Sequence, residues 1–554
     1  MNKIRFSMLA AVALISTMGN AQTVEQGKKF LYYERYKSAQ ETFEKVLAAN
    51  PNNIDAVYWL GETMIHRKDT RDTAGAKALF SKMLMTNGNA PLLLVGMGHV
   101  ELEQGNMTDS RQRFETAISL TKGKDINVLN AVGYANVDAK AGDANYAIEK
   151  LNMATQTKGF SNPQTDIILG DAYHKLLDGG NAVQNYQKAL GMDPKLAEAE
   201  FKIGMIYLTQ NNKEYFLKAF EEATRIDPSY APAYYQLFYY WYFRDVNKAA
   251  VYLDKYTANT DPGPEVEYLK TDFLYASGKN QEARAKAEDL IRQYGDKVNP
   301  RMYRMEAYTA DTLGDVVAAK KAMLDFLTKE DTSKLLPTDF QELARINSKL
   351  PDSVNKAEAF KYYKQAVERD TLPAEREQII SEATALAKKM GKKDIIADLA
   401  AQLYTSKKNP TNTDLYNLGF AYYSAGKFKT ADSVFCGIYE QKYPNEIYGY
   451  LWCAKSRFAQ DDSIGSAGLA VEPYEKLAQV AKGLDSVKYK GQILESYFYL
   501  AGYYNNIKKD KERAIANLQK VLDIDPGNKL ASEYIEKLKK PVRQPAAKPK
   551  ASSK

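Results

Sequence analysis

The side chains that most often carry out chemistry are scarce in this sequence of 554 residues, which contains 3 His and 2 Cys. His66, His99 and His174 fall in separate segments, and none has a further His or Cys at the spacing of metal ligands. The sequence also lacks a glycine-rich phosphate loop and the HExxH and GxSxG motifs. We therefore predict no catalytic residue, no cofactor and no metal site, and a protein that is not an enzyme.

The two cysteines, Cys436 and Cys453, are too few for a disulfide-rich scaffold. Both fall on helices predicted to be neighbours, so a disulfide between them is one alternative. The other is a pair of free thiols, buried as small apolar side chains. The sequence leaves this choice open.

The first residues have the layout of a secretory signal peptide. Lys3 and Arg5 precede an apolar stretch over 8–15, and small residues follow up to Ala21. We predict a signal peptide over 1–21, cleaved after Ala21. The apolar stretch is shorter than the roughly 20 residues needed to cross a bilayer, and no later stretch qualifies as a transmembrane segment. The expected product is exported, soluble and periplasmic.

The net charge of +7 comes mainly from the C-terminal end of the chain. Residues 537–554 contain Lys and Arg but no acid, and their own charge is +7. The rest of the mature chain is close to neutral, which argues against a nucleic-acid partner. The tail over 541–554, rich in Pro, Ala and Lys, is predicted to be disordered. It either contacts anionic surfaces such as cell-wall polymer or lipid headgroups, or only aids solubility.

One spacing of small, aromatic and proline residues recurs along the chain. Steps of three and four residues place side chains on one helix face, and a step of nine crosses a short turn. Asp-Pro or Asn-Pro then ends the second helix, because a residue before proline avoids the α region. The unit is thus a helical hairpin, which must stack on its neighbours to bury its apolar faces. Examples of the spacing are Gly170, Tyr173, Ala182, Tyr186, Ala189 and Pro194, then Gly204, Tyr207, Phe216, Phe220, Ala223 and Pro228.

With these residues the chain resembles the tetratricopeptide repeat family throughout its mature length. The resemblance implies an all-α fold, a right-handed α-solenoid of about fourteen helical hairpins, some of them degenerate, with a capping helix over 529–540. The abundance of Tyr, Lys and Asn, together with the leader, resembles an exported repeat protein of a Bacteroidetes-type bacterium. The expected divisions are an N-terminal array (22–264), degenerate repeats whose register stays open (265–405), and a C-terminal array with its cap (406–540).

The resemblance also places the first helix of each hairpin on the concave side of the solenoid. Tyr is frequent in the row of side chains expected to face this groove, and it suits binding surfaces because its flat apolar ring ends in a polar tip. The alternative for each ring is packing against adjacent repeats or filling a tight superhelix. The candidates are Phe201, Met205, Tyr235, Tyr239, Tyr242, Tyr268, Tyr275, Tyr416, Phe420, Tyr423, Tyr499 and Tyr503.

These features favour a non-enzymatic periplasmic scaffold that binds protein or peptide partners in a concave, Tyr-rich groove, within an envelope complex. A glycan- or peptidoglycan-binding protein is the alternative, with Tyr rings stacked on sugars and the basic tail on anionic polymer. The family's basic clamp for a peptide carboxylate is not expected, because Phe201, Tyr235 and Tyr416 stand where Lys or Asn would be needed. The sequence does not specify the partner, the oligomeric state or an association with the outer membrane.

Overall fold

The computed structural model describes residues 23–67 and 71–540, which form helices and turns and contain no strand. The all-α prediction is confirmed for these residues, whereas the predicted signal peptide and the basic tail lie outside them. The chain divides into two compact units, an N-terminal unit up to Leu313 and a C-terminal unit from Gly314 onward. Three expectations stay predictions: the division of the chain at residues 264 and 405, the handedness of the solenoid, and the number of repeats.

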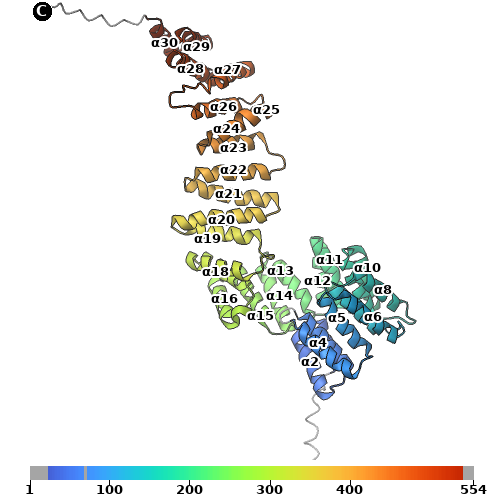
Figure 1. Cartoon of the computed structure of the whole chain (residues 1–554). Coiled ribbons are helices and arrows are strands. Elements are labelled where there is room, and N and C mark those ends of the chain that lie inside the picture. Colours follow the sequence, from blue (N-terminus) through green and yellow to red (C-terminus); the bar gives the residue numbers. More distant parts are fainter. Residues whose placement is uncertain (1–22, 68–70, 541–554) are drawn as a thin grey trace, which may run out of the picture. The chain divides into compact units, whose positions relative to one another are not determined.

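In the N-terminal unit, successive helices pack together as hairpins (Figure 1). Its helices are α1 (Val24–Tyr32), α2 (Tyr36–Ala49), α3 (Ile54–His66), α4 (Thr73–Thr86), α5 (Pro91–Glu103), α6 (Met107–Leu120), α7 (Ile126–Asp138), α8 (Ala144–Thr155), α9 (Pro163–Lys175), α10 (Gly179–Met192), α11 (Ala197–Thr209), α12 (Lys213–Ile226), α13 (Ala231–Trp241), α14 (Val246–Asn259), α15 (Pro264–Ala276), α16 (Asn280–Tyr294) and α17 (Arg301–Thr312).

The C-terminal unit continues this arrangement and ends on the predicted capping helix, α30. A π-helical segment, Ser433–Tyr439, interrupts one of its hairpins between α24 and α25. Its helices are α18 (Val316–Lys329), α19 (Pro337–Lys349), α20 (Ser353–Arg369), α21 (Pro373–Lys389), α22 (Lys393–Ser406), α23 (Asn412–Ser424), α24 (Phe428–Asp432), α25 (Glu440–Lys442), α26 (Ile447–Gln460), α27 (Val471–Asp485), α28 (Lys490–Asn506), α29 (Lys511–Ile524) and α30 (Lys529–Lys539).

The residues of the repeated spacing have the roles that the sequence predicts. The glycine of the first helix faces an aromatic ring of the second, and a Cβ on Gly170 would lie 2.3 Å from the ring of Tyr186. The same contact joins Gly204 to Phe220 and Gly419 to Phe435. Only a residue without a side chain lets the two helices approach this closely around a buried ring. The hairpin angle is therefore encoded by glycine and aromatic residues together.

The last hairpin departs from this rule. Gly502 matches the spacing in sequence, but a Cβ built on it would meet no atom within 4 Å. Gly133 differs from it, because a Cβ there would lie 2.7 Å from the leucine that it faces, Leu151. Gly502 is thus replaceable, although the sequence pattern treats it like the other glycines.

This difference predicts opposite effects for the same substitution at two sites. Gly419→Ala should destabilise the C-terminal unit by about 1–2 kcal/mol, since overpacking against the Phe435 ring outweighs the better helix propensity of alanine. Gly502→Ala should stabilise it by about 0.5–1 kcal/mol through propensity alone. Urea unfolding followed by circular dichroism would measure both. Equal effects at the two sites would contradict the proposed packing role.

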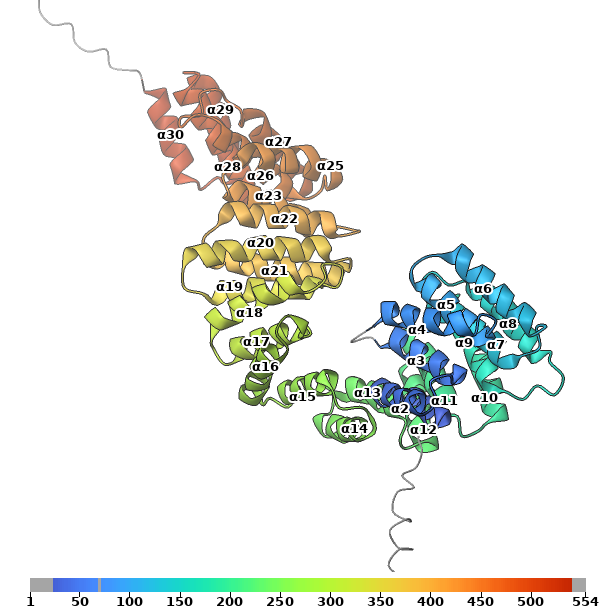
Figure 2. The ribbon, with the colours of Figure 1, turned by 60° about the horizontal axis from the view of Figure 1, so that its bottom comes forward.

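The N-terminal unit closes on itself, a feature that Figure 2 shows as α2 lying beside α11–α13. The hydroxyl of Tyr33 donates to Asp227 Oδ2 over 2.8 Å, although the two residues are 194 positions apart. The Tyr32 ring packs on Tyr230 with centroids 5.2 Å apart. The first hairpin therefore contacts the loop between α12 and α13.

A second closing contact centres on Asp261, in the loop between α14 and α15. Its carboxylate accepts from Arg35 Nε at 3.2 Å and from the backbone N–H of Ser38 at 3.0 Å. The side chain of Asp261 is 14% exposed, so these charge-assisted hydrogen bonds are largely shielded from water. Part of the N-terminal array is thus a closed turn of superhelix instead of an open groove.

Candidate functional site

A strip of aromatic side chains, made of two contacting groups, runs along the first helices of consecutive hairpins in the C-terminal unit. On α23, Tyr416 and Phe420 have ring centroids 6.1 Å apart. Trp452 on α26 lies 5.0 Å from Phe420 and 4.9 Å from Tyr423. Farther along, Phe458 on α26 lies 5.6 Å from Tyr499 on α28. We call this strip the aromatic row; its members are Tyr416, Phe420, Tyr423, Tyr448, Trp452, Phe458 and Tyr499.

Several rings of the aromatic row are open to solvent. Phe420 is 40% exposed, Tyr448 49% and Phe458 45%. Apolar rings that remain exposed side by side on successive helices are the usual mark of an interaction surface. Tyr503, one turn beyond Tyr499, is half-buried against the loop at Gly468 and extends the row without joining its ring contacts.

Three members of the aromatic row, Tyr448, Trp452 and Phe458, are absent from the sequence-based candidates. All three lie on α26, whose hairpin carries a longer loop over 461–470. This loop breaks the step of nine residues from which the groove-facing row is counted. Tyr448 and Trp452, four positions apart on one face of α26, are the signal that could have identified this helix.

The central tyrosines on α13 are half-buried within the N-terminal unit. Tyr235 and Tyr239 pack with centroids 4.8 Å apart, and the Tyr239 hydroxyl accepts from Arg301 Nη1 at 3.2 Å. Burial raises the pKa of Tyr239, and the Arg301 guanidinium opposes this rise. Tyr242 joins the same cluster around Phe238. Contact between this cluster and a ligand stays a prediction.

The Arg301 guanidinium also lies near two acids on α15. Its Nη2 atom is 2.9 Å from Glu265 Oε1, and its Nη1 atom is 3.7 Å from Asp272 Oδ2. Burial raises the pKa of Asp272 to about 6, although Arg301 favours the charged form. The polar ends of the central tyrosines therefore meet a charged network that belongs to the protein itself.

Other candidates from the N-terminal unit are packing residues. Tyr268 is wrong as a groove residue: it is 4% exposed, and its hydroxyl accepts from the backbone N–H of Asn299 at 3.1 Å. Phe201 packs 5.6 Å from both Phe220 and Tyr230, inside the region closed by the first hairpin. Met205 is partly buried on the same helix. Tyr275 is half-buried, with ring centroids 6.3 Å from Phe243 and 6.2 Å from Tyr308.

Two of the three histidines, which fall in separate segments of the sequence, meet in the folded chain. The rings of His66 and His99 have centroids 6.4 Å apart, and both face Asp138. They lie about one repeat apart in sequence, so stacking of the hairpins brings the last turns of their helices together. The spacing of one repeat is the signal that the sequence-based search for short motifs missed.

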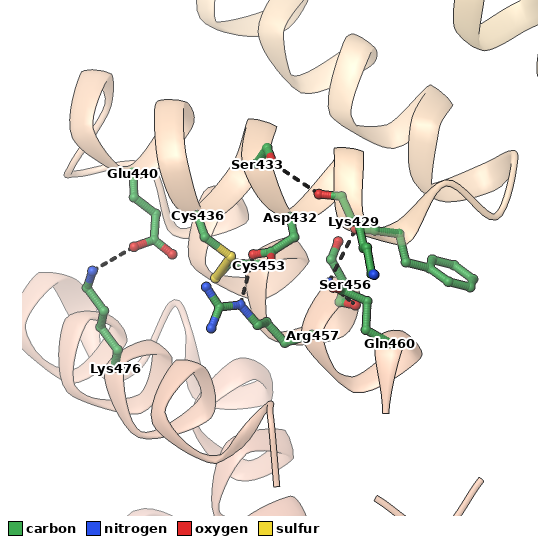
Figure 3. The surroundings of a disulfide bond; sticks show 11 residues. Lys429, Asp432, Ser433, Cys436, Glu440, Cys453, Ser456, Arg457, Gln460 and Lys476 are labelled. Atoms are coloured by element: carbon green, nitrogen blue, oxygen red, sulfur yellow. Dashed lines mark hydrogen bonds and ion pairs between the residues drawn. A yellow bond between two sulfur atoms is a disulfide. The ribbon is translucent and has the colours of Figure 1, made fainter. Parts of the chain in front are cut away.

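The cysteine question is answered by a disulfide between Cys436 in the π-helical segment and Cys453 on α26 (Figure 3). Each cysteine is next in sequence to an aromatic residue, Phe435 and Trp452, whose rings stack with centroids 6.3 Å apart. Arg457 Nε also lies 2.9 Å from Asp432 Oδ1 beside the bond. The disulfide thus fixes the helix that carries Trp452 at the centre of the aromatic row.

Within residues 23–67 and 71–540, no helix is both long enough and apolar enough to span a membrane.

Three solved structures illustrate what the chain is similar to. One, the C-terminal part of a TPR repeat-containing protein from Cytophaga hutchinsonii, is 28% identical, with coverage of 48% of this chain and 98% of that chain and a TM-score of 0.27.

The other two are less similar to this chain in sequence. Yeast Tom70 is 12% identical, covering 73% of this chain and 95% of its own at a TM-score of 0.35. The P58(IPK) TPR domain is 15% identical, covering 66% of this chain and 98% of its own at a TM-score of 0.27.

Sequence models of the tetratricopeptide repeat match residues 169–231 and 495–528. These matches cover hairpins in both units, and the first includes the close contacts of Gly170 and Gly204 with aromatic rings. Repeats of this kind support a role as a scaffold for protein–protein interaction. The chain therefore contains tetratricopeptide repeats in both of its units.

Proposed function

We propose that this protein is an exported, non-enzymatic scaffold that binds a protein or peptide partner along the aromatic row of its C-terminal unit. The observation that carries the proposal is the exposure of Phe420 on α23 and of Tyr448 and Phe458 on α26, beside the half-buried rings of the aromatic row. Rigid aromatic side chains lose little rotamer freedom on binding and cover much apolar area, which makes them frequent centres of binding energy. Lys455, with its Nζ 5.3 Å from the centroid of the Trp452 ring, adds a positive charge at the edge.

Two features support a periplasmic location. The sequence of 1–21 has the layout of a cleavable leader, and the Cys436–Cys453 disulfide suits an oxidising compartment. The mature protein is expected to begin at Gln22, which intact-mass measurement of the native protein would test. A full-length cellular product with reduced cysteines would overturn this part of the proposal.

The binding proposal predicts that Phe420→Ala/Tyr448→Ala weakens partner capture at least tenfold. Both side chains are exposed, so their loss should remove contact area and leave the fold intact. The mature protein, carrying a photo-crosslinker at position 423, would be incubated with native envelope extract, and crosslinked proteins quantified with and without the double substitution. The identified partner would then be titrated against both proteins.

Tyr534→Ala is the matched control, because Tyr534 is 46% exposed on α30 but lies away from the aromatic row. It should bind like the wild type, and circular dichroism should show the same unfolding midpoint for all three proteins. Equal capture by the double variant would overturn the proposal. Co-sedimentation with insoluble peptidoglycan, lost only in the double variant, would instead assign the row to glycan.

A further inference from the structure

Two histidines and an aspartate meet at the last turns of α3, α5 and α7, inside the N-terminal unit. His66 Nε2 lies 3.2 Å from Asp138 Oδ1, and His99 Nε2 lies 3.4 Å from Asp138 Oδ2. A carboxylate oxygen of Glu103, at the end of α5, lies within 4.8 Å of ligand atoms of both His99 and Asp138. Ligand atoms around one tetrahedral zinc ion are roughly 3.4 Å apart, so His99, Asp138 and Glu103 need little movement to share an ion. His66 reaches Asp138 alone and would have to turn toward the other two groups.

Both imidazoles are held with the same nitrogen pointing inward. His66 Nδ1 lies 3.2 Å from the backbone carbonyl oxygen of Glu62, and His99 Nδ1 lies 2.8 Å from Glu62 Oε2. In the neutral ring each acceptor favours the tautomer with its proton on Nδ1, which leaves Nε2 as the nitrogen for an ion. Against the effect of burial, Glu62 and Asp138 raise the pKa of His99 to about 10, so an ion would have to displace a proton from its Nε2 atom. Metal-binding histidines are oriented in this way by a carbonyl or carboxylate behind the ring. One residue, Glu62, therefore orients both rings.

The cluster also contains polar atoms whose bonding is incomplete. His99 is fully buried, and its Nε2 atom has the ion-pair contact with Asp138 at 3.4 Å but no well-aligned hydrogen bond within the described residues. Buried polar atoms without a well-formed hydrogen bond are rare in folded proteins, and an ion is one way to satisfy them. The side chains of His66 and Asp138 are 18% and 26% exposed, so solvent reaches the open side of the cluster.

Two further side chains, Tyr134 and Arg71, contact members of this cluster. The Tyr134 ring stacks on His66 with centroids 5.3 Å apart, and its hydroxyl contacts His66 Nε2. This hydroxyl would give way to an ion at that nitrogen. Arg71 pairs with the Glu103 carboxylate and keeps it beside the cluster.

We propose that His66, His99 and Asp138, with Glu103 as fourth ligand, bind one divalent transition-metal ion of the zinc type. Two imidazole nitrogens with two carboxylates suit Zn²⁺ and Co²⁺, whereas Ca²⁺ and Mg²⁺ prefer oxygen ligands alone. The ion would join three successive hairpins at their inner face. This site lies in the N-terminal unit and is independent of the partner binding proposed for the aromatic row.

The test uses the purified mature protein, stripped with EDTA and titrated with Zn²⁺ by calorimetry and with Co²⁺ by visible absorption. We expect one ion per chain, a Co²⁺ spectrum typical of tetrahedral ligands, and a higher unfolding midpoint with Zn²⁺. His66→Ala and Asp138→Ala should each weaken binding at least 100-fold. Glu62→Gln, which removes the carboxylate behind the His99 ring and keeps the backbone carbonyl behind His66, should weaken it about 10- to 100-fold.

His174→Ala is the matched control, because His174 lies on α9 and belongs to no such cluster among the described residues. It should bind Zn²⁺ like the wild type. Because His66 is partly exposed, its substitution is the one least prone to unfold the unit, and circular dichroism would verify this. Absence of saturable Zn²⁺ binding by the wild type, or equal binding by folded His66→Ala, would overturn the proposal.

Discussion

Loss of the Cys436–Cys453 disulfide is expected to destabilise the C-terminal unit by about 3 kcal/mol, the effect of closing a loop of roughly 15 residues in the unfolded chain. The two cysteines are separated by 17 positions. The substitution Cys436→Ala/Cys453→Ala removes the bond without burying a new polar group, which matters because Cys453 is 4% exposed. The loss should concentrate on α23 to α26, since repeats transmit stability mainly to their neighbours.

Hydrogen exchange of the C-terminal unit would measure this effect helix by helix. Amides of α24 and α26 should exchange about 100-fold faster in the double variant, in line with the expected free energy. Wild-type protein treated with a reductant should behave in the same way, whereas reductant should leave the variant unchanged. Identical exchange in oxidised wild type and variant would show that the bond adds no stability.

Asp261→Ala is expected to release the first hairpin of the N-terminal unit, at a cost of about 3 kcal/mol for three hydrogen bonds to the carboxylate, from Arg35 Nε, the Ser38 N–H and the Ser38 hydroxyl. The substitution leaves Arg35 and the Ser38 N–H without their acceptor at a site largely shielded from water. Amides over 24–49 should then exchange faster, and the contact of Tyr33 with Asp227 should be weakened with them.

Asp254→Ala provides the comparison, because Asp254 is an exposed acid on the neighbouring helix α14. Its removal should change neither the exchange of residues 24–49 nor the unfolding midpoint. Unchanged protection of the first hairpin in Asp261→Ala would mean that the aromatic contact between Tyr32 and Tyr230 suffices for closure.

The helical hairpins could be predicted from the sequence because each depends on residues close together in the chain. The glycine at one helix and the ring that fills its space are near neighbours in sequence, as for Gly170 and Tyr186. The helix ends are equally local: Asn50, Asp193, Asp227 and Asp525 each cap a helix directly before proline.

The candidate sites were less predictable, because they depend on how hairpins stack. Small rotations between successive repeats add up along the array and decide whether the first hairpin reaches Asp261. No local sequence pattern predicts the total rotation. For the same reason Tyr268 is buried where a groove position was expected, and His66 meets His99 across repeats. On α26, the inserted loop shifted the count and concealed Trp452.

The closed N-terminal unit also has a consequence for the order of events during synthesis. Tyr33 and Arg35 leave the ribosome long before their partners, which follow 194 and 226 positions later. At translation rates of about 5–20 residues per second, this delay is on the order of ten to forty-five seconds. Hairpins can form within that interval from local contacts, but closure cannot. We therefore expect the nascent chain to pass through a lengthy open form, in which the ring of Tyr32, which later packs on Tyr230, is available to chaperones.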